Sequence, residues 1–332
     1  MWSVQGVDGV PVLVEADRPQ VGAGQILIEV SAAGVNRADL LQVAGHYPPP
    51  AGAPQTLGLE AAGTVVEVGP GVDSAWLGRA AVALVEGGAQ AQFCAANVDL
   101  ALPLPIAGRL NGYIAGAALL EAAVTAWHNL VDLGFPSDSW AGRFVLIQGG
   151  SGAVGTVAVQ LAKALGATVG TTAGEPDRCH KLTLLGADAA ADYHNPDELL
   201  GMKQELTDGH GFDLILDVSG AGGLERNLEL LAKHGILNII GLQKGRHAQL
   251  DLNQVLTKSA RIQGSTIRGL DVEAKARLVR AVGEHVWPLV QAQRIRPVIA
   301  YTLAFSKAKR AHKYLAKSTA RPLGKIVLSI DA

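Results

Sequence analysis

The chain has 332 residues, of which 48% are hydrophobic, and its formal net charge is -2. This length suffices for two domains, and the near-neutral charge gives no reason to expect nucleic acid or an anionic membrane as a partner. The two cysteines, Cys94 and Cys179, exclude a disulfide framework and a multi-cysteine zinc lobe. No basic segment precedes an apolar run at the start, and Glu121 interrupts the apolar stretch 112–127, which is too short to span a bilayer. The sequence therefore predicts a cytoplasmic protein with no membrane span.

Short segments containing Val and Ile, separated by Gly, Pro and Asp, dominate the first third of the chain. Strands are expected at residues 11–16, 25–30, 63–68, 80–85 and 91–96. Strands at this spacing are typical of a small barrel or sandwich. A helical pattern then begins at Ala115 and continues to Leu130.

From Phe144 onward, expected strands and helices alternate. The strands are expected at 144–148, 168–172, 189–193, 212–218, 235–240 and 261–267. The helices between them are expected at 155–165, 178–185, 197–207, 223–233 and 251–258. Strands joined by helical crossovers predict a doubly wound parallel sheet with the strand order 3-2-1-4-5-6.

The C-terminal part leaves this alternation. A long helix is expected from Asp271, a strand near 298–303, a helix near 306–317 and a final strand at 325–330. Because the final strand has no place in the parallel sheet, we expect it to return to the first domain. The sequence therefore predicts an α/β fold in which a Rossmann domain, residues 123–267, is inserted into a discontinuous β-rich catalytic domain, residues 1–122 and 268–332.

One glycine-rich loop lies between an expected strand and an expected helix. Gly150, Gly152 and Gly155 fit the pattern G-x-G-x-x-G, which provides a tight turn, close approach to a pyrophosphate and close packing of helix on strand. The start of the helix adds unpaired N–H groups and the positive end of the helix dipole. The pattern alone is weak in a chain with 40 glycines, but its place between strand and helix favours a dinucleotide site.

The second strand of the expected sheet leads into Ala173 and Gly174, where NAD-selective Rossmann folds carry an acidic residue. Arg178 offers a fork of donors to a 2′-phosphate, and Tyr193 is expected beside the same phosphate. Plainer roles stay open, with Arg178 as a solvated helix residue and Tyr193 as a packing residue. The nearby Glu175 opposes a phosphate at this place, as does Asp177, but the balance favours NADP(H).

Further motifs are spread along the whole chain. They lie at 32–39, 45–50, 57–64, 66–71, 124–127, 264–268, 311–314 and 324–328, besides the glycine loop. With these motifs the chain resembles the zinc-free NADPH:quinone oxidoreductases of the medium-chain dehydrogenase/reductase superfamily, particularly the group like the p53-inducible quinone oxidoreductase. The resemblance implies a GroES-like catalytic domain and NADPH-dependent reduction of quinones or related conjugated carbonyls.

The zinc alcohol dehydrogenases of this superfamily carry a cysteine in the segment matching 34–39 and a histidine in the segment matching 58–60. Asn36 and Leu59 stand in these places here, so Glu60 lacks the companions that a catalytic zinc needs. No metal is therefore expected. Cys94 is interpreted as a buried strand thiol and His46 as a loop residue.

The resemblance also assigns roles to single residues. It places Asn36 and Tyr47 beside the acceptor, where an amide and a phenol would stabilise the oxyanion that forms as hydride arrives. A turn or cap role for Asn36 and a loop-anchoring role for Tyr47 are the alternatives. Gly152, Ala153 and Val154 are assigned to the pyrophosphate. The residues assigned to the ribose and nicotinamide are Thr125, Ser219, Gly241, Leu242, Thr266, Ile267, Arg268 and Lys325.

Two other functions stay open from the sequence. One is reduction of the C=C bond of enones or 2-alkenals, because both kinds of acceptor need the same oxyanion support. The other is a non-catalytic role, in which a bound NADPH makes the protein a sensor or structural component. A homodimer is expected, paired through the edge strand 261–267, since such pairing covers an exposed sheet edge.

Overall fold

The computed structural model describes residues 1–106, 109–317 and 323–330. The chain divides into two compact units. Unit 1 comprises residues 1–124, 268–293 and 297–332, and unit 2 comprises residues 125–267 and 294–296. Each unit has its own sheet and is described separately.

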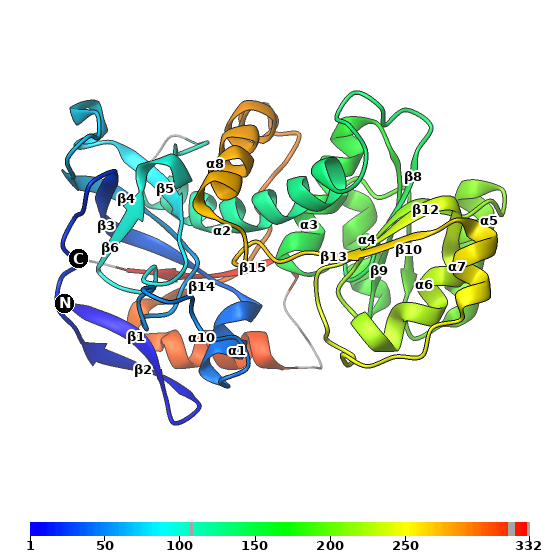
Figure 1. The fold of residues 1–332 in the computed structure, drawn as a ribbon, viewed down its shortest axis with the longest axis horizontal. Helices are drawn as coiled ribbons and strands as arrows, with labels where there is room; N and C mark the ends of the chain where they lie inside the picture. The colour runs from blue at the N-terminus through cyan, green and yellow to red at the C-terminus, as the bar shows by residue number, and fades with distance from the viewer. Residues whose placement is uncertain (107–108, 318–322, 331–332) are drawn as a thin grey trace. The chain divides into compact units, whose positions relative to one another are not determined.

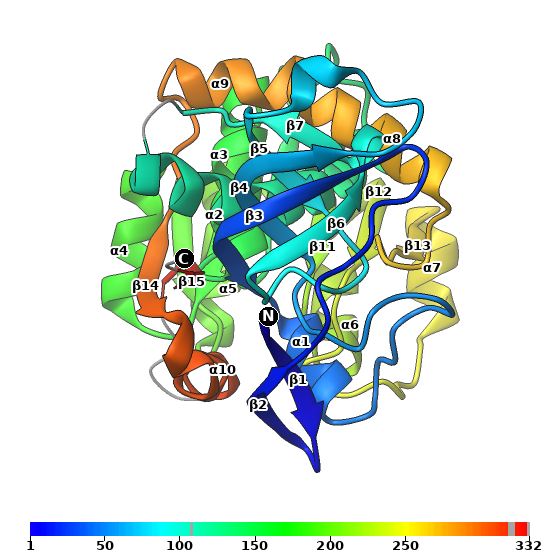
Figure 2. The same ribbon diagram turned by 90° about the vertical axis from the view of Figure 1, so that its left-hand side faces the viewer.

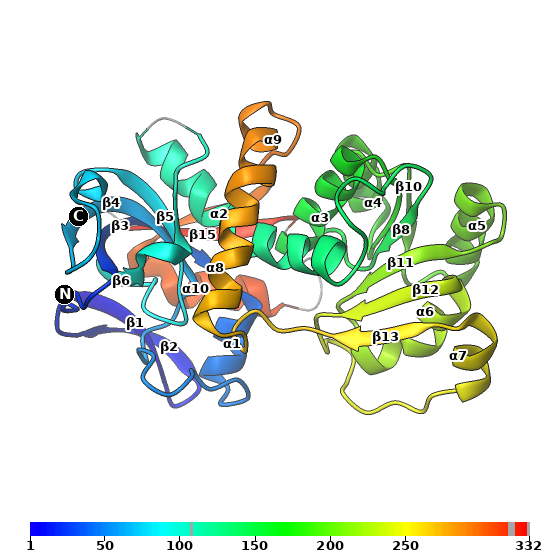
Figure 3. The same cartoon turned by 45° about the horizontal axis from the view of Figure 1, so that its top comes forward.

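Unit 2 is built on a six-stranded parallel sheet with the order β10-β9-β8-β11-β12-β13. Its strands are β8 (Phe144–Ile147), β9 (Thr168–Ala173), β10 (Ala189–Asp192), β11 (Phe212–Asp217), β12 (Leu231–Ile239) and β13 (Arg261–Gly264). This confirms the predicted 3-2-1-4-5-6 order. The connecting helices are α3 (Ala153–Leu165), α4 (Pro176–Leu184), α5 (Pro196–Thr207), α6 (Leu224–Leu230) and α7 (Leu252–Lys258), and they cover both faces of the sheet (Figures 1 and 3).

Three boundaries in and beside unit 2 differ from expectation. The helix expected to reach residue 233 ends at Leu230, because Leu231 and Ala232 turn inward as the buried start of β12. The edge strand expected to reach residue 267 ends at Gly264, where its pairing with β12 stops. The helical pattern expected from Ala115 begins earlier, as α2 (Arg109–Trp127).

Helix α2 runs on into a π-helical turn, His128–Asp132. The resulting stretch Asn111–Asp132 is 22 residues long and apolar enough to cross a membrane by length and composition. This differs from the expectation of a stretch too short to span. However, 72% of its most apolar window is buried inside the protein, as in a core helix that is hydrophobic all round.

Unit 1 contains a seven-stranded sheet with the order β14-β15-β3-β4-β5-β7, and β6 pairs with β3 (Figure 2). The strands are β3 (Gln25–Val35), β4 (Glu60–Val68), β5 (Ala80–Leu84), β6 (Phe93–Asn97), β7 (Ala101–Pro103), β14 (Ile299–Ala304) and β15 (Lys325–Ser329). The final strand, β15, pairs antiparallel with β3, which confirms that it returns to the first part of the chain. The predicted fold class, a Rossmann sheet inserted into a discontinuous β-rich domain, is therefore confirmed.

Several elements of unit 1 were not predicted. Strand β2 (Val10–Glu15) matches the strand expected at 11–16, but its partner β1 (Trp2–Val7) was missed. A hairpin joins the two through Asp8 and Gly9, both with positive φ, and an Asp-Gly pair of this kind is a strong hairpin signal. The short helix α1 (Arg37–Val43) and strand β7 were also missed. The long helix expected from Asp271 is divided into α8 (Val272–Ala281), a π-helical turn and α9 (Trp287–Gln291), whereas α10 (Ala308–Ala316) matches the helix expected near 306–317.

Candidate functional site

The loop between β8 and α3 in unit 2 has the shape of a phosphate-binding loop. A Cβ on Gly150 would collide with the Thr171 hydroxyl, and one on Gly155 would collide with the carbonyl oxygen of Gly149. A Cβ on Gly152 would meet only Gly149 O, at 3.5 Å, so this side of the loop is open. Gly152 begins α3 as its N-cap, and a glycine contributes no side chain to cap the first N–H groups. The open glycine and the helix start fit a pyrophosphate.

The ends of β9 and β10 bring two predicted residues together. A Cβ on Gly174 would lie 2.5 Å from the Tyr193 hydroxyl, so the tyrosine side chain lies directly against this glycine. The ammonium of Lys244 lies 4.7 Å from the centre of the Tyr193 ring. Sequence reasoning missed Lys244, because it lies far from this strand in sequence and reaches it only through the fold.

Arg178 is paired with Glu175, the carboxylate expected from the sequence to oppose a phosphate at this place. Its Nη2 donates to Glu175 Oε1 and its Nε lies near Glu175 Oε2, each at 3.4 Å. The Glu175 side chain is 50% exposed. The Arg178 side chain is only 14% exposed, but its bonds to the half-exposed carboxylate are long and contribute little, so the guanidinium can exchange this partner for a stronger anion at small cost.

The loops that follow the carboxyl ends of β11 and β12 lie against each other and hold three predicted residues. The buried carboxylate of Asp217 accepts hydrogen bonds from the backbone N–H groups of Ser219 and Gly220, at 3.0 and 2.7 Å. Burial raises the pKa of Asp217 despite these bonds. A Cβ on Gly241 would approach Val218 O to 2.9 Å, and the neighbouring Leu242 is exposed. The two loops thus present Ser219, Gly241 and Leu242 at the edge where ligands of open α/β sheets bind.

The other residues predicted near the nicotinamide are more dispersed. Thr125 is buried, and its carbonyl oxygen accepts a 2.9 Å bond from Asn129 Nδ2. Thr266 is exposed and Ile267 half-buried, in the loop after β13 rather than in a strand. Arg268 and Lys325 belong to unit 1, together with Asn36 and Tyr47.

A buried polar network in unit 1 surrounds Asn36. Lys325 Nζ lies 2.6 Å from Asn36 Oδ1, to which it donates, and 2.5 Å from Glu60 Oε1. Asn36 Nδ2 donates to Glu60 Oε1 at 3.2 Å, and Glu60 Oε2 accepts from the backbone N–H of Glu121 at 2.9 Å. Lys325 is 1% exposed and Glu60 fully buried. Burial lowers the pKa of Lys325, but the Glu60 and Glu121 carboxylates outweigh it and the pKa lies above its usual value.

Gly34 makes room for this network. A Cβ at this position would collide with the Glu60 carboxylate and with the carbonyl oxygen of Ala117 in α2. The glycine of the segment 32–39 thus allows β3, β4 and α2 to approach closely around a buried ion pair.

A second set of bonds begins at Asp39 in the first turn of α1. Its carboxylate accepts from the backbone N–H of Asn36 at 2.7 Å, that of Gly58 at 3.0 Å, and Gln90 Nε2 at 3.1 Å. Gln90 Oε1 in turn lies 2.9 Å from His312 Nε2. Burial raises the pKa of Asp39 to about 6 and lowers the pKa of His312 to about 4.

Arg268 anchors the loop that carries Tyr47. Its Nη1 donates to Tyr47 O at 3.2 Å, and its Nη2 donates to Gln42 Oε1 at 2.7 Å and to Glu86 O at 2.6 Å. The guanidinium carbon lies 5.0 Å from the centre of the Tyr47 ring. The structure therefore brings Arg268 to Tyr47 and Lys325 to Asn36, whereas the sequence analysis assigned both cations to the cofactor.

The described residues do not fit a catalytic zinc. Among them, no three His, Cys, Asp or Glu side chains gather as a ligand group. Cys94 is buried, which raises its pKa to about 12 and keeps the thiol protonated, whereas zinc binds the thiolate. Glu60 is paired with Lys325.

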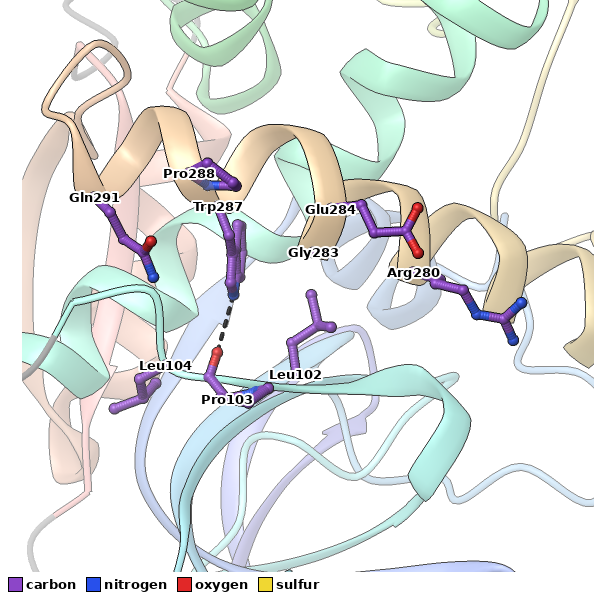
Figure 4. Close-up of a pocket in the computed structure, with 9 residues that line it drawn as sticks. All are labelled: Leu102, Pro103, Leu104, Arg280, Gly283, Glu284, Trp287, Pro288 and Gln291. Carbon is purple, nitrogen blue, oxygen red and sulfur yellow. Dashed lines mark hydrogen bonds between the residues drawn. The ribbon is translucent and has the colours of Figure 1, made fainter.

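A surface groove of about 340 Å³ also lies in unit 1, between the segment 102–104 and helices α8 and α9 (Figure 4). The Trp287 indole donates to Pro103 O at 2.9 Å across its floor. None of the nine residues drawn in Figure 4 is a predicted site residue, so this groove is separate from the groups described above.

Comparison with known proteins identifies the family. A model for the alcohol dehydrogenase GroES-like domain matches residues 22–134, and one for zinc-binding dehydrogenases matches residues 153–282. A solved alcohol dehydrogenase superfamily protein from Novosphingobium aromaticivorans is 30% identical over 99% of both chains, with a TM-score of 0.86. The chain belongs to this superfamily of oxidoreductases, the medium-chain dehydrogenases/reductases.

Two quinone oxidoreductases and a polyketide synthase subunit are also similar to this chain. A mycobacterial quinone oxidoreductase is 27% identical over 99% of both chains, with a TM-score of 0.82. The Escherichia coli quinone oxidoreductase, solved in complex with NADPH, is 25% identical over 99% of this chain and 100% of its own, with a TM-score of 0.85. A phenolphthiocerol/phthiocerol polyketide synthase subunit of Mycobacterium tuberculosis is 32% identical over 96% of this chain. The chain spans only 14% of that synthase subunit.

Proposed function

We propose that the protein is an NADPH-dependent reductase of quinones or related conjugated carbonyls that works without zinc. The observation that carries the proposal is the Asn36 amide, held between a buried lysine and a buried carboxylate where zinc-dependent relatives place a metal ligand. The proposal includes membership of the group that resembles the p53-inducible quinone oxidoreductase.

Unit 2 supplies the groups that would hold the dinucleotide. The open side of Gly152 and the N–H groups of Ala153 and Val154 suit the pyrophosphate. Tyr193 and Lys244 suit a 2′-phosphate beside Gly174, and Arg178 adds a donor if it leaves Glu175. The NADPH complex of the Escherichia coli relative supports NADP(H) as the cofactor. The bound cofactor would supply the hydride.

Unit 1 supplies groups suited to the acceptor. A quinone or enone gains negative charge on its carbonyl oxygen as hydride arrives, and that charge needs hydrogen-bond donors in a site with little water. Asn36 offers an amide N–H, and Tyr47 offers a phenol. Lys325 bonds the Asn36 amide itself, whereas Arg268 bonds the backbone carbonyl of Tyr47 and lies over its ring, so the amide and the backbone that carries the phenol are set before an acceptor binds.

Reduction of a conjugated C=C bond is the second candidate. The similarity to a polyketide synthase subunit covers almost the whole of this chain, and the JamJ enoyl reductase shares the fold with a TM-score of 0.83. An enone, a 2-alkenal or an unsaturated thioester would need the same oxyanion support as a quinone. Turnover of quinones compared with turnover of 2-alkenals separates the two reactions.

The test is steady-state oxidation of NADPH with 1,2-quinones, 1,4-quinones and 2-alkenals in buffer containing a metal chelator. Turnover of a quinone supports the proposal, and turnover of 2-alkenals alone moves the function to C=C reduction. Tight NADPH binding with no turnover of any acceptor refutes both and leaves the non-catalytic role. Asn36→Ala should lower kcat about 10- to 100-fold with little change in the Kd for NADPH.

The nucleotide preference has its own test. Arg178→Glu and Lys244→Glu should each lower the ratio of kcat/KM for NADPH over NADH, because a donor to the 2′-phosphate becomes a repelling charge. Lys181→Glu is the matched control, since Lys181 is an exposed residue on the same helix as Arg178. A ratio that falls equally in the control would show a general charge effect rather than a phosphate contact.

A further inference from the structure

The buried contact between Lys325 and Asn36 is set by the strand register of unit 1. Strand β15 pairs antiparallel with β3, and Ile326 lies opposite Val35. In an antiparallel pair the next residues outward are Lys325 and Asn36, so these two lie beside each other at the end of the pairing. Glu60 begins the neighbouring strand β4. The three side chains therefore meet because three strands, distant in sequence, lie side by side.

The chemistry of the partners determines which way the Asn36 amide faces. An ammonium group only donates hydrogen bonds and an ionised carboxylate only accepts them. The amide oxygen must therefore face Lys325, at 2.6 Å, and the amide nitrogen must face Glu60, at 3.2 Å. The nitrogen of a primary amide carries two N–H groups, and Glu60 Oε1 takes one of them through a long bond.

The same contact strengthens Asn36 as a donor. A cation bonded to the amide oxygen draws electron density from the nitrogen, and hydrogen bonds in series reinforce one another inside a protein. The effect is largest where water is absent, and Lys325 is 1% exposed.

We propose that Lys325 is a positioning residue, which orients and polarises the Asn36 amide so that its N–H group can stabilise the acceptor oxyanion. The proposal rests on the proposed function, because it assumes that Asn36 meets the acceptor. It assigns Lys325 to the acceptor side of the reaction rather than to the cofactor. A purely structural role, in which Lys325 only neutralises Glu60, is the competing explanation.

Four proteins separate the two explanations: wild type, Lys325→Met, Glu60→Gln and the double variant. Lys325→Met alone leaves Glu60 as an uncompensated buried charge, so its folding is expected to suffer. The double variant removes both charges and should regain most of the thermal stability. Glu60→Gln keeps the bond from Lys325 to Asn36 but leaves Lys325 without its counter-charge, so the step from Glu60→Gln to the double variant measures the loss of the lysine itself.

The measurements are the melting temperature, the Kd for NADPH by fluorescence, and kcat and KM with an acceptor that the wild type reduces. We expect kcat of the double variant to fall about 10- to 100-fold below that of Glu60→Gln, with the Kd for NADPH the same in both. Recovery of kcat in the stable double variant would overturn the proposal, because neutrality alone would then suffice. If Lys325→Met fails to fold, the double variant and Glu60→Gln carry the comparison.

A readout independent of turnover keeps the two proposals distinguishable. The side-chain NH₂ signals of Asn36, identified by their loss in Asn36→Ala, should shift between Glu60→Gln and the double variant. Unchanged signals would refute the positioning role. Absence of turnover by the wild type with every acceptor would instead refute the proposed function, whatever the Asn36 signals show.

Discussion

Substitution of Asp39 or His312 should tilt the pH dependence of the stability of unit 1 in opposite directions. The two residues are joined through Gln90, which donates to Asp39 and accepts from His312. Burial favours the neutral form of both side chains. The aspartate becomes neutral by gaining a proton, whereas the histidine becomes neutral by losing one. The test therefore uses Asp39→Asn and His312→Gln, because each new side chain is similar in size to the original and cannot titrate.

The pKa displacements set the magnitude. The pKa of Asp39 rises from 3.8 to about 6, so this group contributes stability that is fully present below pH 3.8 and is lost as pH rises through about 6. The pKa of His312 falls from 6.5 to about 4, so its contribution is present above pH 6.5 and is lost as pH falls through about 4. At about 1.4 kcal/mol per pKa unit, each contribution is about 3 kcal/mol. In the wild type the two slopes oppose each other and largely cancel between about pH 4 and 6.

The difference between each single variant and wild type should show the slope of the residue that was removed. Relative to wild type, Asp39→Asn should lose about 1 kcal/mol of unfolding free energy per pH unit as the solution is acidified, because it lacks the contribution by which Asp39 stabilises the wild type at low pH. His312→Gln should gain about as much. The assay is urea unfolding from about pH 4.5 to 7.5, always taken as the difference from wild type so that all other titrating groups cancel.

Two controls sharpen the comparison. The double variant lacks both terms, so its difference from wild type should be nearly constant across the same pH range. His180→Gln removes an exposed histidine of α4 and should also give a constant difference. If both single variants keep a constant difference from wild type, burial of Asp39 and His312 does not control their protonation and the reasoning is wrong.

Other parts of the structure make further predictions. Gly155→Ala places a Cβ against the backbone of Gly149, so the Kd for NADPH should rise at least about tenfold, and an unchanged Kd in a folded variant would contradict the tight loop. In Gly174→Ala the new Cβ meets only the end of the Tyr193 side chain, so the variant should fold normally but prefer NADPH over NADH less strongly than wild type does. An unchanged preference would show that Gly174 and Tyr193 do not contact the 2′-phosphate. Arg268→Met removes three bonds within unit 1 and should lower kcat/KM for the acceptor about tenfold with the Kd for NADPH unchanged; full activity would exclude loop anchoring. Light scattering should give twice the chain mass of 34.4 kDa, and a monomer at every concentration would refute pairing through β13.

The parallel sheet was predictable because its signals are local. Strands such as β8 and β11 contain short apolar runs, and the loop after β8 carries glycines whose spacing, together with their place between strand and helix, identifies the strand-to-helix turn. The order of the strands then follows from general rules for crossover connections. The ends of elements were less predictable. Whether β13 stops at Gly264 depends on pairing with β12, which no local pattern contains.

The polar network of unit 1 was only partly predictable. The resemblance to a family identified Asn36 and Tyr47, but their partners come from strands and loops far away in sequence. One signal was available: Glu60 and Lys325 each begin a strand that continues with apolar residues. A charged residue at the start of a buried strand needs an opposite charge nearby, and pairing such residues with one another would have suggested this contact.

The presence of Glu60 in a chain that lacks its expected zinc-ligand companions has a physical explanation in this pair. A fully buried carboxylate is costly unless a cation and hydrogen bonds compensate it, and here Lys325, Asn36 and the Glu121 N–H do so. The carboxylate therefore needs no metal to remain buried. Removing only one partner leaves an uncompensated charge whose cost to folding masks any effect on chemistry. For this reason the neutral double variant, rather than either single one, decides whether the cation serves the fold alone or also the reaction.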